Sequence, residues 1–288
     1  EGFNIDYIGP VDGHNIKDLI NVFEAAKKKD GPIVIHVVTK KGKGYKPAEE
    51  DKNGKWHGVG KFDVKTGEML SSIPENYKTY SQIVADKVLK IMDKDDRVTA
   101  ITPAMISGSC MNNMFAKYPK RCFDVGIAED HAITFACGMA LEGLRPFVSV
   151  YSSFLQRAYD QLNHDVCRMN LPVVIGVDRC SIIGEDGDSH QGVFDISYMN
   201  SLPNMVIAEG KNSSQIEALL DLAFSQTSPF AIRYPRGSIE YNCDCKCDVA
   251  LGKWEFVVNN IDSKVSIITY GNDVCKIEKD INDNHLPY

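Results

Sequence analysis

The segment FDVGIAEDHAITFACGMALEG, residues 123–143, predicts a short strand, a turn and then a long helix that begins at Glu129. Residues 133–141 of this helix are almost wholly apolar, so we expect the helix to be buried. Glu129 stands at the start of the apolar segment, where a carboxylate is unfavourable unless another group hydrogen-bonds it. The simplest interpretation is that Glu129 only complements the positive end of the helix dipole. A functional role would require further polar residues nearby.

The chain around this segment alternates between strands and helices. The expected strands cover residues 98–102, 122–127, 146–151, 172–178, 205–209 and 230–234, and the expected helices cover 81–92, 108–118, the segment from 129, 153–169 and 213–225. This alternation predicts an α/β fold in which helices cover both faces of a parallel sheet. Ligands of such sheets bind beyond the carboxyl ends of the strands. Glu129 and Tyr151 each follow an expected strand, as do Arg179 and Arg236, so we expect these four residues to share one rim.

The two ends of the chain have a different pattern. The first 72 residues predict a helix with Asn15 as its N-cap, a strand at 31–40, glycine-rich turns at 9–14 and 42–45, and a long polar loop. Near the other end, KVSIITYG, residues 264–271, predicts a strand that opens a further domain. We therefore expect three parts, 1–72, 73–245 and 246–288.

The composition excludes several classes of protein. The 288 residues are 43% hydrophobic with a net charge of −7, which argues against a nucleic-acid-binding protein. There is no apolar run of about 18 residues, so we expect no membrane span. The nine cysteines, an odd number, are scattered through apolar segments and are typical of reduced thiols in the cytoplasm. The sequence contains neither GxGxxG after a strand nor GxSxG, which argues against a nicotinamide-binding site and an α/β-hydrolase.

Three cysteines lie close together in the sequence near the start of the third part, and such a cluster can bind a metal ion. The CDCKC motif, residues 243–247, places three cysteines on one side of an extended strand. No histidine or second cysteine pair stands at zinc-site spacing, so we expect no metal site there.

Three segments carry side chains that are suited to chemistry. YSSFLQRAYDQ places Tyr151, Phe154 and Arg157 at a strand-to-helix corner, although aromatic residues there can simply be core. The loop DRCSIIGEDGDSHQG carries Arg179, Asp186 and His190. It fits either a solvated turn or a loop that handles protons.

The third segment, RYPRG, sets Arg233 and Arg236 around a proline turn. Paired arginines at a strand end are typical of a phosphate site, and a surface salt bridge is an equally common role.

Taken together, these segments resemble one family. The motifs YIGPVDGH, TKKGKGY, WHGVGKFD, TPAM, DVGIAEDHAITFACGMA, YSSFLQRAYDQ, GEDGDSHQGVFD and RYPRG occur in the order of the 1-deoxy-D-xylulose-5-phosphate synthases, thiamine diphosphate-dependent relatives of transketolase. The resemblance covers residues 1 to about 240. It implies a transketolase-like pyrimidine-binding domain at 73–245. Residues 1–72 would then be the C-terminal part of a diphosphate-binding domain plus a linker, and 246–288 the start of a C-terminal transketolase-like domain.

The resemblance also assigns the cofactor contacts. Glu129 would hydrogen-bond the ring nitrogen of the aminopyrimidine of thiamine diphosphate, since a carboxyl group in a dry site can share a proton with that nitrogen. Phe154 would stack on the pyrimidine ring, and Tyr45 would lie against the cofactor.

The implied reaction is the decarboxylation of pyruvate and its condensation with D-glyceraldehyde 3-phosphate, which gives 1-deoxy-D-xylulose 5-phosphate for isoprenoid, thiamine and pyridoxal synthesis. The resemblance assigns the phosphate of the acceptor to Arg179 and Arg236, with Tyr151 and Arg157 close by. It assigns proton handling and hydrogen bonds to the intermediate to His57 and His190, and the orientation of the His190 loop to Asp186.

One feature of the family is missing from this sequence. The Gly-Asp-Gly motif that holds Mg²⁺ is not found, and EDGD at 185–188 is a poor match. In the family this motif lies upstream of YIGPVDGH, so we expect the Mg²⁺ ligands outside this chain and no metal site within it. The third domain also looks cut short. We accordingly expect a fragment that by itself neither binds Mg²⁺–thiamine diphosphate tightly nor turns over pyruvate, from an enzyme that is a cytoplasmic homodimer.

Three alternatives stay open. The chain can belong to another thiamine enzyme, such as a transketolase or a 2-oxoacid dehydrogenase subunit. It can be a non-catalytic half-subunit that only binds a partner. It can also be an α/β binding domain without a cofactor.

Overall fold

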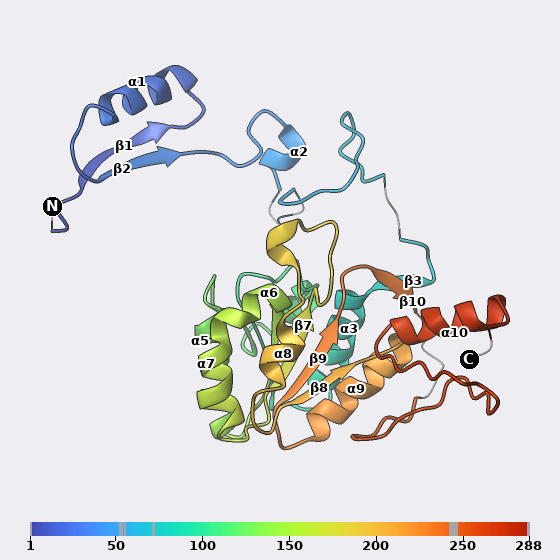
Figure 1. The fold of residues 1–288 in the computed structure, drawn as a ribbon. Helices are drawn as coiled ribbons and strands as arrows, with labels where there is room; N and C mark the ends of the chain where they lie inside the picture. Colours follow the sequence, from blue (N-terminus) through green and yellow to red (C-terminus); the bar gives the residue numbers. More distant parts are fainter. Residues whose placement is uncertain (1, 52–53, 55, 71–72, 242–246, 287–288) are drawn as a thin grey trace. The chain divides into compact units, whose positions relative to one another are not determined.

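The computed structural model describes residues 2–51, 54, 56–70, 73–241 and 247–286, and Figure 1 shows its ribbon. Contacts within the chain divide it into two compact units, Glu1–Ser72 and Ile73–Tyr288.

The first unit contains two parallel strands joined by a helix. Its elements are β1 (Asp6–Asp12), α1 (Ile16–Ala26), β2 (Ile33–Val38) and α2 (Lys46–Glu49). As predicted, Asn15 caps α1, where its side chain accepts a hydrogen bond from the backbone N–H of Asp18 at 3.3 Å.

The prediction of a glycine-rich turn at residues 9–14 was wrong, because β1 runs through most of it. Glycine and proline argue against a strand, and sequence patterning therefore missed it. In the structure, Asp6 to Ile8 pair with Ile33 to Ile35, and the register shifts before Val11. The strand thus tolerates Gly9 and Pro10 in an interruption of its pairing.

The second unit is an α/β domain. Its elements are β3 (Tyr77–Thr79), α3 (Tyr80–Met92), β4 (Val98–Thr102), α4 (Asn112–Lys117), β5 (Cys122–Asp124), α5 (Glu129–Leu141), β6 (Arg145–Tyr151), α6 (Ser152–Leu155), α7 (Tyr159–Gln161), β7 (Val174–Asp178), α8 (Asp195–Met199), β8 (Val206–Glu209), α9 (Ser213–Ser225), β9 (Phe230–Tyr234), β10 (Ser238–Glu240) and α10 (Asp273–Asp283). Most strands and helices lie where the sequence predicts them.

The main sheet is parallel, as predicted. Within the described residues it has six strands in the order β5-β4-β6-β7-β9-β8. The chain runs outward from β4 to β5 and then crosses to the other side of β4 to form β6. The sheet therefore reverses its winding between β4 and β6, which is where ligands of such folds bind. A separate antiparallel pair, β10-β3, joins the segment after β9 to the start of α3.

Helices cover both faces of the sheet and form two apolar clusters. One cluster packs α5 and the helical segment after β6 against one face, and the other packs α3, α4 and α9 against the opposite face. Neighbouring strand residues alternate between them: Val174 packs in the second cluster and Ile175 in the first. The strands β4, β7 and β9 are buried at every residue, as expected for a parallel sheet covered on both sides.

Two predicted helices differ from the structure. The helix predicted at 108–118 begins only at Asn112, because Cys110 has a left-handed backbone with a φ of 57° that ends any helical run before it. The helix predicted at 153–169 changes its turn width, with a 3₁₀ turn at Gln156–Ala158 and a π turn at Leu162–Cys167. One face of this segment stays fully buried throughout, and apolar periodicity does not record the changes of turn width.

The strand predicted at 264–271 was also wrong. This segment has no regular structure, and Val265, Ile268 and Tyr270 are more than half exposed. An apolar run forms a strand only when a neighbouring strand pairs with its backbone, and the described residues offer none here. The domain assignment of 246–288 stays a prediction.

No helix of the described residues combines the length and apolar character needed to cross a membrane. Within the same residues, no group of three or more His, Cys, Asp or Glu side chains could hold a metal ion. Cys243 and Cys245 of the CDCKC motif lie outside the described residues, and Cys247 is a free thiol.

The close packing of the sheet gives a test of the fold. A Cβ atom at Gly176 of β7 would lie 2.7 Å from the ring of Phe147 and 3.0 Å from the hydroxyl of Tyr234. Replacing Gly176 with alanine should therefore lower the free energy of unfolding by about 1–3 kcal/mol, measured by urea denaturation. A Cβ at Gly138 in α5 meets no atom within 4 Å, so Gly138→Ala serves as the control and should not destabilise the fold. Equal effects of the two changes would contradict this packing.

Candidate active site

Glu129 is the first residue of α5 and its side chain is 5% exposed. The group that hydrogen-bonds it is Arg157, whose Nη1 donates to Oε1 at 3.2 Å. The guanidinium of Arg157 also lies over the ring of Phe154, 5.0 Å from its centroid. The structure thus places Arg157 beside Glu129 and Phe154. Its predicted contact with a phosphate stays a prediction.

Phe154 lies between two further rings. It stacks on Tyr151 with ring centroids 5.5 Å apart and planes 20° apart, and the centroid of the His190 ring lies 5.1 Å away with the planes at 67°. Nδ1 of His190 lies 2.9 Å from the hydroxyl of Ser189. Phe154 and His190 line a cavity, whereas Tyr151 is buried.

The cavity has a volume of about 480 Å³. Its walls are Ser153, Phe154, Gln156, Arg157, Ser189 and His190. The hydroxyl of Ser153 is buried without a hydrogen-bond partner among the described residues. Aromatic and polar side chains line this cavity together, so it can hold a ligand with both apolar surface and polar groups. The buried Glu129 reaches this wall through Arg157, which contacts both its carboxylate and the ring of Phe154.

Arg179 follows β7 and is held in place by several partners. Its Nη1 donates to Oδ2 of Asp178 at 2.9 Å, to the hydroxyl of Ser81 at 3.0 Å and to the carbonyl of Gly108 at 3.2 Å. The guanidinium lies 4.3 Å from the ring centroid of Tyr151. Arg179 has a left-handed backbone with a φ of 55°, which is uncommon for a residue with a side chain.

Burial governs the titration of two groups around Arg179. Burial raises the pKa of the fully buried Asp178, whereas Arg179 and Ser81 oppose that shift. Burial also raises the pKa of Tyr151 to about 12, although Arg179 lowers it somewhat. Tyr151 is therefore a neutral hydrogen-bond donor at physiological pH.

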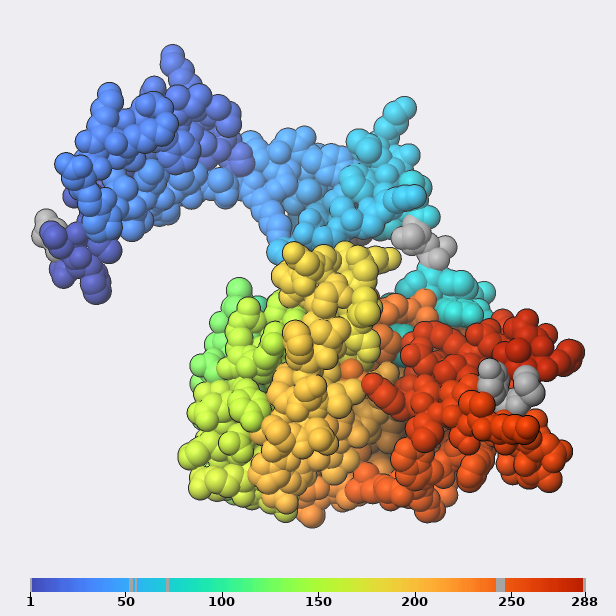
Figure 2. Space-filling view, viewed as in Figure 1, coloured from blue at the N-terminus to red at the C-terminus, as the bar shows by residue number. Residues whose placement is uncertain are grey.

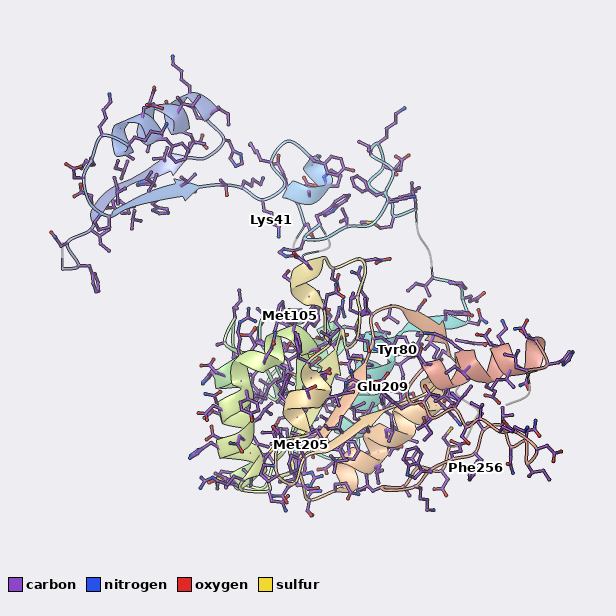
Figure 3. The ribbon with its side chains drawn as sticks, viewed as in Figure 1. Lys41, Tyr80, Met105, Met205, Glu209 and Phe256 are labelled. Atoms are coloured by element: carbon purple, nitrogen blue, oxygen red, sulfur yellow. The ribbon has the colours of Figure 1, made fainter. Side chains whose placement is uncertain are left out.

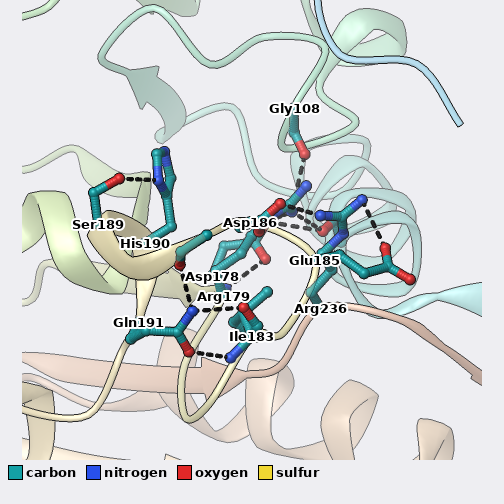
Figure 4. A network of polar contacts seen from close by, with 12 residues as sticks. Gly108, Asp178, Arg179, Ile183, Glu185, Asp186, Ser189, His190, Gln191 and Arg236 are labelled. Carbon is teal, nitrogen blue, oxygen red and sulfur yellow. Dashed lines mark hydrogen bonds and ion pairs between the residues drawn. The ribbon is translucent and has the colours of Figure 1, made fainter.

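The loop after β7 folds back on itself and carries Asp186 and His190. Gln191 acts as a clasp: its Oε1 accepts from the backbone N–H of Ile183, and its Nε2 donates to the carbonyl oxygens of Ile183 and Gly187, at 2.5–2.6 Å (Figure 4). This segment belongs to the surface of the second unit shown in yellow in Figure 2. The clasp fixes the loop so that Asp186 reaches the arginines.

Asp186 lies between the two arginines of the rim. Its Oδ1 contacts Nη1 of Arg236, and its Oδ2 lies 3.9 Å from Nε of Arg179 (Figure 4). Nη2 of Arg236 also lies 3.1 Å from Oε2 of Glu185. The sheet rim thus presents two guanidinium groups close together, linked by one carboxylate.

Arg233 does not join this pair. It is 3% exposed within β9, where Nε donates to Asp195 at 3.0 Å and Nη1 contacts Glu209, which is labelled in Figure 3. Ser152 also donates to Asp195, at 2.9 Å. The suggested pairing of Arg233 with Arg236 at one phosphate was therefore wrong. The alternative, a surface salt bridge, is found for Arg236, which pairs with Glu185 and Asp186, but not for Arg233. Because Arg233 lies inside the strand rather than after it, its side chain enters the core.

Tyr45 and His57 lie in the first unit. The hydroxyl of Tyr45 is buried without a hydrogen-bond partner among the described residues, and its ring packs on Trp56 and Phe62 with centroids 5.1 and 5.9 Å away. Nδ1 of His57 contacts Nζ of Lys41, which is labelled in Figure 3. The roles predicted for Tyr45 and His57 stay predictions.

The structure therefore brings together eight of the ten predicted site residues: Glu129, Tyr151, Phe154, Arg157, Arg179, Asp186, His190 and Arg236. Sequence reasoning missed Ser81, Asp178 and Gln191, which hold these residues in place. Asp178 and Gln191 stand directly beside Arg179 and His190 in the sequence, and that adjacency was the available signal.

Two family models match parts of this chain. Residues 76–241 match the family model described as transketolase, pyrimidine binding domain, and residues 1–39 match the model described as 1-deoxy-D-xylulose-5-phosphate synthase. The chain is 47% identical over 269 residues to the 1-deoxy-D-xylulose-5-phosphate synthase of Listeria welshimeri, covering 92% of this chain and 42% of the relative. It is 50% identical over 276 residues to that of Clostridium tetani, covering 96% of this chain and 44% of the relative.

Solved structures share their fold with part of this chain. A structure titled "Split gene transketolase, inactive beta4 tetramer" is similar with a TM-score of 0.51 and 25% identity, over 59% of this chain and 56% of that chain. Transketolase from Leishmania mexicana has a TM-score of 0.54 at 16% identity, over 61% of this chain and 28% of that chain.

This chain is much shorter than the synthases that it matches. The chain spans 42% to 44% of the length of the two synthases described above. The match to the pyrimidine-binding model nevertheless covers more than half of this chain, including every site residue of the second unit. The chain therefore belongs to the transketolase pyrimidine-binding domain family.

Proposed function

We propose that this chain forms the pyrimidine-binding and acceptor-binding part of a 1-deoxy-D-xylulose-5-phosphate synthase. The observation that carries the proposal is a continuous line of contacts along the sheet rim. It runs from Glu129 through Arg157 and Phe154 to Tyr151, and from there to the arginine pair. One end of this line, at Glu129 and Phe154, would bind a heterocycle, and the other end, at the arginine pair, would bind a phosphate. The two relatives described above are both 1-deoxy-D-xylulose-5-phosphate synthases, and they match 92% and 96% of this chain.

The residues present fit thiamine diphosphate on one side of this line. Glu129 would hydrogen-bond the ring nitrogen of the aminopyrimidine, Phe154 would stack on its face, and Tyr45 would lie against the cofactor. When bound, thiamine diphosphate supplies a carbon nucleophile and an electron sink for the decarboxylation of pyruvate. Glu129 is already desolvated, so its hydrogen bond would form in a medium where such bonds are strong. Mg²⁺ would be held by residues other than those described here.

The other side of the line suits the phosphate of D-glyceraldehyde 3-phosphate. Two guanidinium groups can present their N–H donors to one phosphate, and such charge-assisted hydrogen bonds are stronger than neutral ones. Arg179 is already fixed by Asp178 and Ser81, so little conformational freedom is lost on binding. Tyr151, neutral at physiological pH, would donate a further hydrogen bond.

His190 would handle protons between the two sides. It borders both the cavity and the ring of Phe154, and its nitrogen contacts Ser189. Asp186 would orient the loop that carries it, and His57 would serve as the second proton-handling residue. We further propose that the enzyme works as a homodimer in the cytoplasm and supplies isoprenoid, thiamine and pyridoxal synthesis.

A chimaeric enzyme tests this proposal. This chain would replace the 269-residue region that it matches in the Listeria welshimeri synthase. With thiamine diphosphate and Mg²⁺ present, we expect release of carbon dioxide from pyruvate that depends on D-glyceraldehyde 3-phosphate. The product is measured as 1-deoxy-D-xylulose 5-phosphate by mass spectrometry, with the parent synthase as the positive control.

The outcome also separates the alternatives. Turnover of a ketose phosphate donor without pyruvate would indicate a transketolase. A folded, dimeric chimaera that turns over neither substrate would contradict a catalytic role and favour a non-catalytic half-subunit.

A further inference from the structure

Arg236 already carries two carboxylate partners. Nη1 contacts Asp186 and Nη2 lies 3.1 Å from Oε2 of Glu185, so two acids of one loop face both arms of the guanidinium (Figure 4). Two oxygens on a guanidinium fork are also the arrangement that a bound phosphate adopts. An anion that arrives at Arg236 must therefore compete with this loop.

The two acids differ in how firmly they are held. The side chain of Asp186 is 18% exposed and faces Arg179 as well as Arg236. Its backbone N–H donates to Ile183 at 3.4 Å, next to the Gln191 clasp. The side chain of Glu185, by contrast, is 79% exposed, and Arg236 is its ion-pair partner within the described structure. An ion pair this exposed is weak, so a ligand can displace Glu185 while Asp186 stays.

We propose that Glu185 is an intramolecular competitor that sets the affinity of Arg236 for the phosphate of the acceptor. This inference rests on the proposed function, because it takes Arg236 as a phosphate ligand. A ligand that binds only when Glu185 has moved away has an apparent affinity reduced by the fraction of molecules in that open state. Removing the competitor should therefore strengthen binding without adding any contact.

The test measures binding of glycerol 3-phosphate, a phosphate monoester without an aldehyde, to the full 288-residue chain by calorimetry near neutral pH and at constant ionic strength. Glu185→Gln keeps the size of the side chain and removes its charge. We expect this variant to bind about two- to five-fold more tightly than the unmodified chain, the range expected for loss of one exposed ion pair. Asp188→Asn is the matched control, because Asp188 is exposed on the same loop and makes no ion pair with Arg236 in the described structure. It should change binding less, through long-range charge alone.

A second comparison isolates the contact itself. In an Arg236→Gln background, Glu185→Gln should no longer strengthen binding, because the competitor has lost the group for which it competes. The inference is overturned if Glu185→Gln binds like the unmodified chain, if Asp188→Asn gives the same gain, or if the gain persists in the Arg236→Gln background.

The same data distinguish failure of this inference from failure of the proposed function. If the unmodified chain binds glycerol 3-phosphate and Arg236→Gln weakens it, but Glu185→Gln has no effect, only the inference on Glu185 fails. If no variant binds the ester, the proposed phosphate site fails and the inference fails with it.

Discussion

Replacing Arg233 with methionine should lower the free energy of unfolding by about 3–5 kcal/mol. The change removes the cation between Asp195 and Glu209, whose side chains are 1% and 8% exposed, and leaves two carboxylates buried beside each other. Methionine fills most of the volume of arginine, so the loss would report the uncompensated charges rather than a cavity. The measurement is the urea midpoint, with near-ultraviolet circular dichroism to confirm that the variant is folded before denaturation.

The effect should depend on pH with a defined sign. Burial already raises the pKa of Glu209, and Arg233 opposes that shift, so loss of Arg233 would raise this pKa further. A carboxyl with a raised pKa takes up its proton more readily in the folded state than in the unfolded state. The ionised Glu209 carboxylate therefore destabilises the variant at high pH. This destabilisation decreases as the pH falls through the pKa of Glu209 in the folded state, towards its value of about 4.3 in the unfolded state. We expect the deficit of Arg233→Met to be smaller at about pH 5 than at about pH 8.

Arg97→Met is the matched control for this prediction. Arg97 is exposed and pairs with Asp95 at 2.7 Å, so its loss should leave stability nearly unchanged at both pH values. A deficit for Arg233→Met that is small, or that grows as pH falls, would contradict a buried ion-pair network.

The second large effect concerns Glu129. In the chimaeric synthase, Glu129→Gln should lower turnover by about 100- to 10,000-fold, the range typical for loss of a group that shares a proton with a reacting system. Glutamine keeps the shape of the side chain but cannot share that proton. The side chain remains buried next to Arg157, so the fold should be preserved, which a thermal melt would check.

Asp130→Asn is the control for Glu129, because Asp130 lies in the same first turn of α5 but is exposed. Both changes remove one negative charge from the positive end of the helix dipole. If the two variants lose turnover equally, Glu129 only complements the dipole, and its proposed contact with the cofactor is contradicted.

Sequence patterning predicted the sheet well because the strands are buried on both faces. The expected bounds of β4, α9 and β9 match the structure at both ends. The same patterning failed for residues 264–271, which also contain β-branched and aromatic residues. Pairing with a neighbour decides whether such a run becomes a strand, and a neighbour cannot be seen in a local pattern.

The site was predictable only in outline. Parallel strands end at a common edge, so the gathering of Glu129, Tyr151, Arg179 and Arg236 follows from topology. The pairing of Arg157 with Glu129 depends on the turn geometry after β6, where the helix changes width, and periodicity carries no such information.

The backbone and the side chain of Arg179 have opposite effects on folding. Glycine and, less often, asparagine adopt its left-handed backbone with little strain, whereas arginine does so at a disadvantage. The ion pair with the fully buried Asp178 opposes that disadvantage, because loss of the guanidinium would leave a buried carboxylate without its cation. Glycine at position 179 would therefore relieve the backbone and strand a charge in the interior, so stability by itself already favours the arginine.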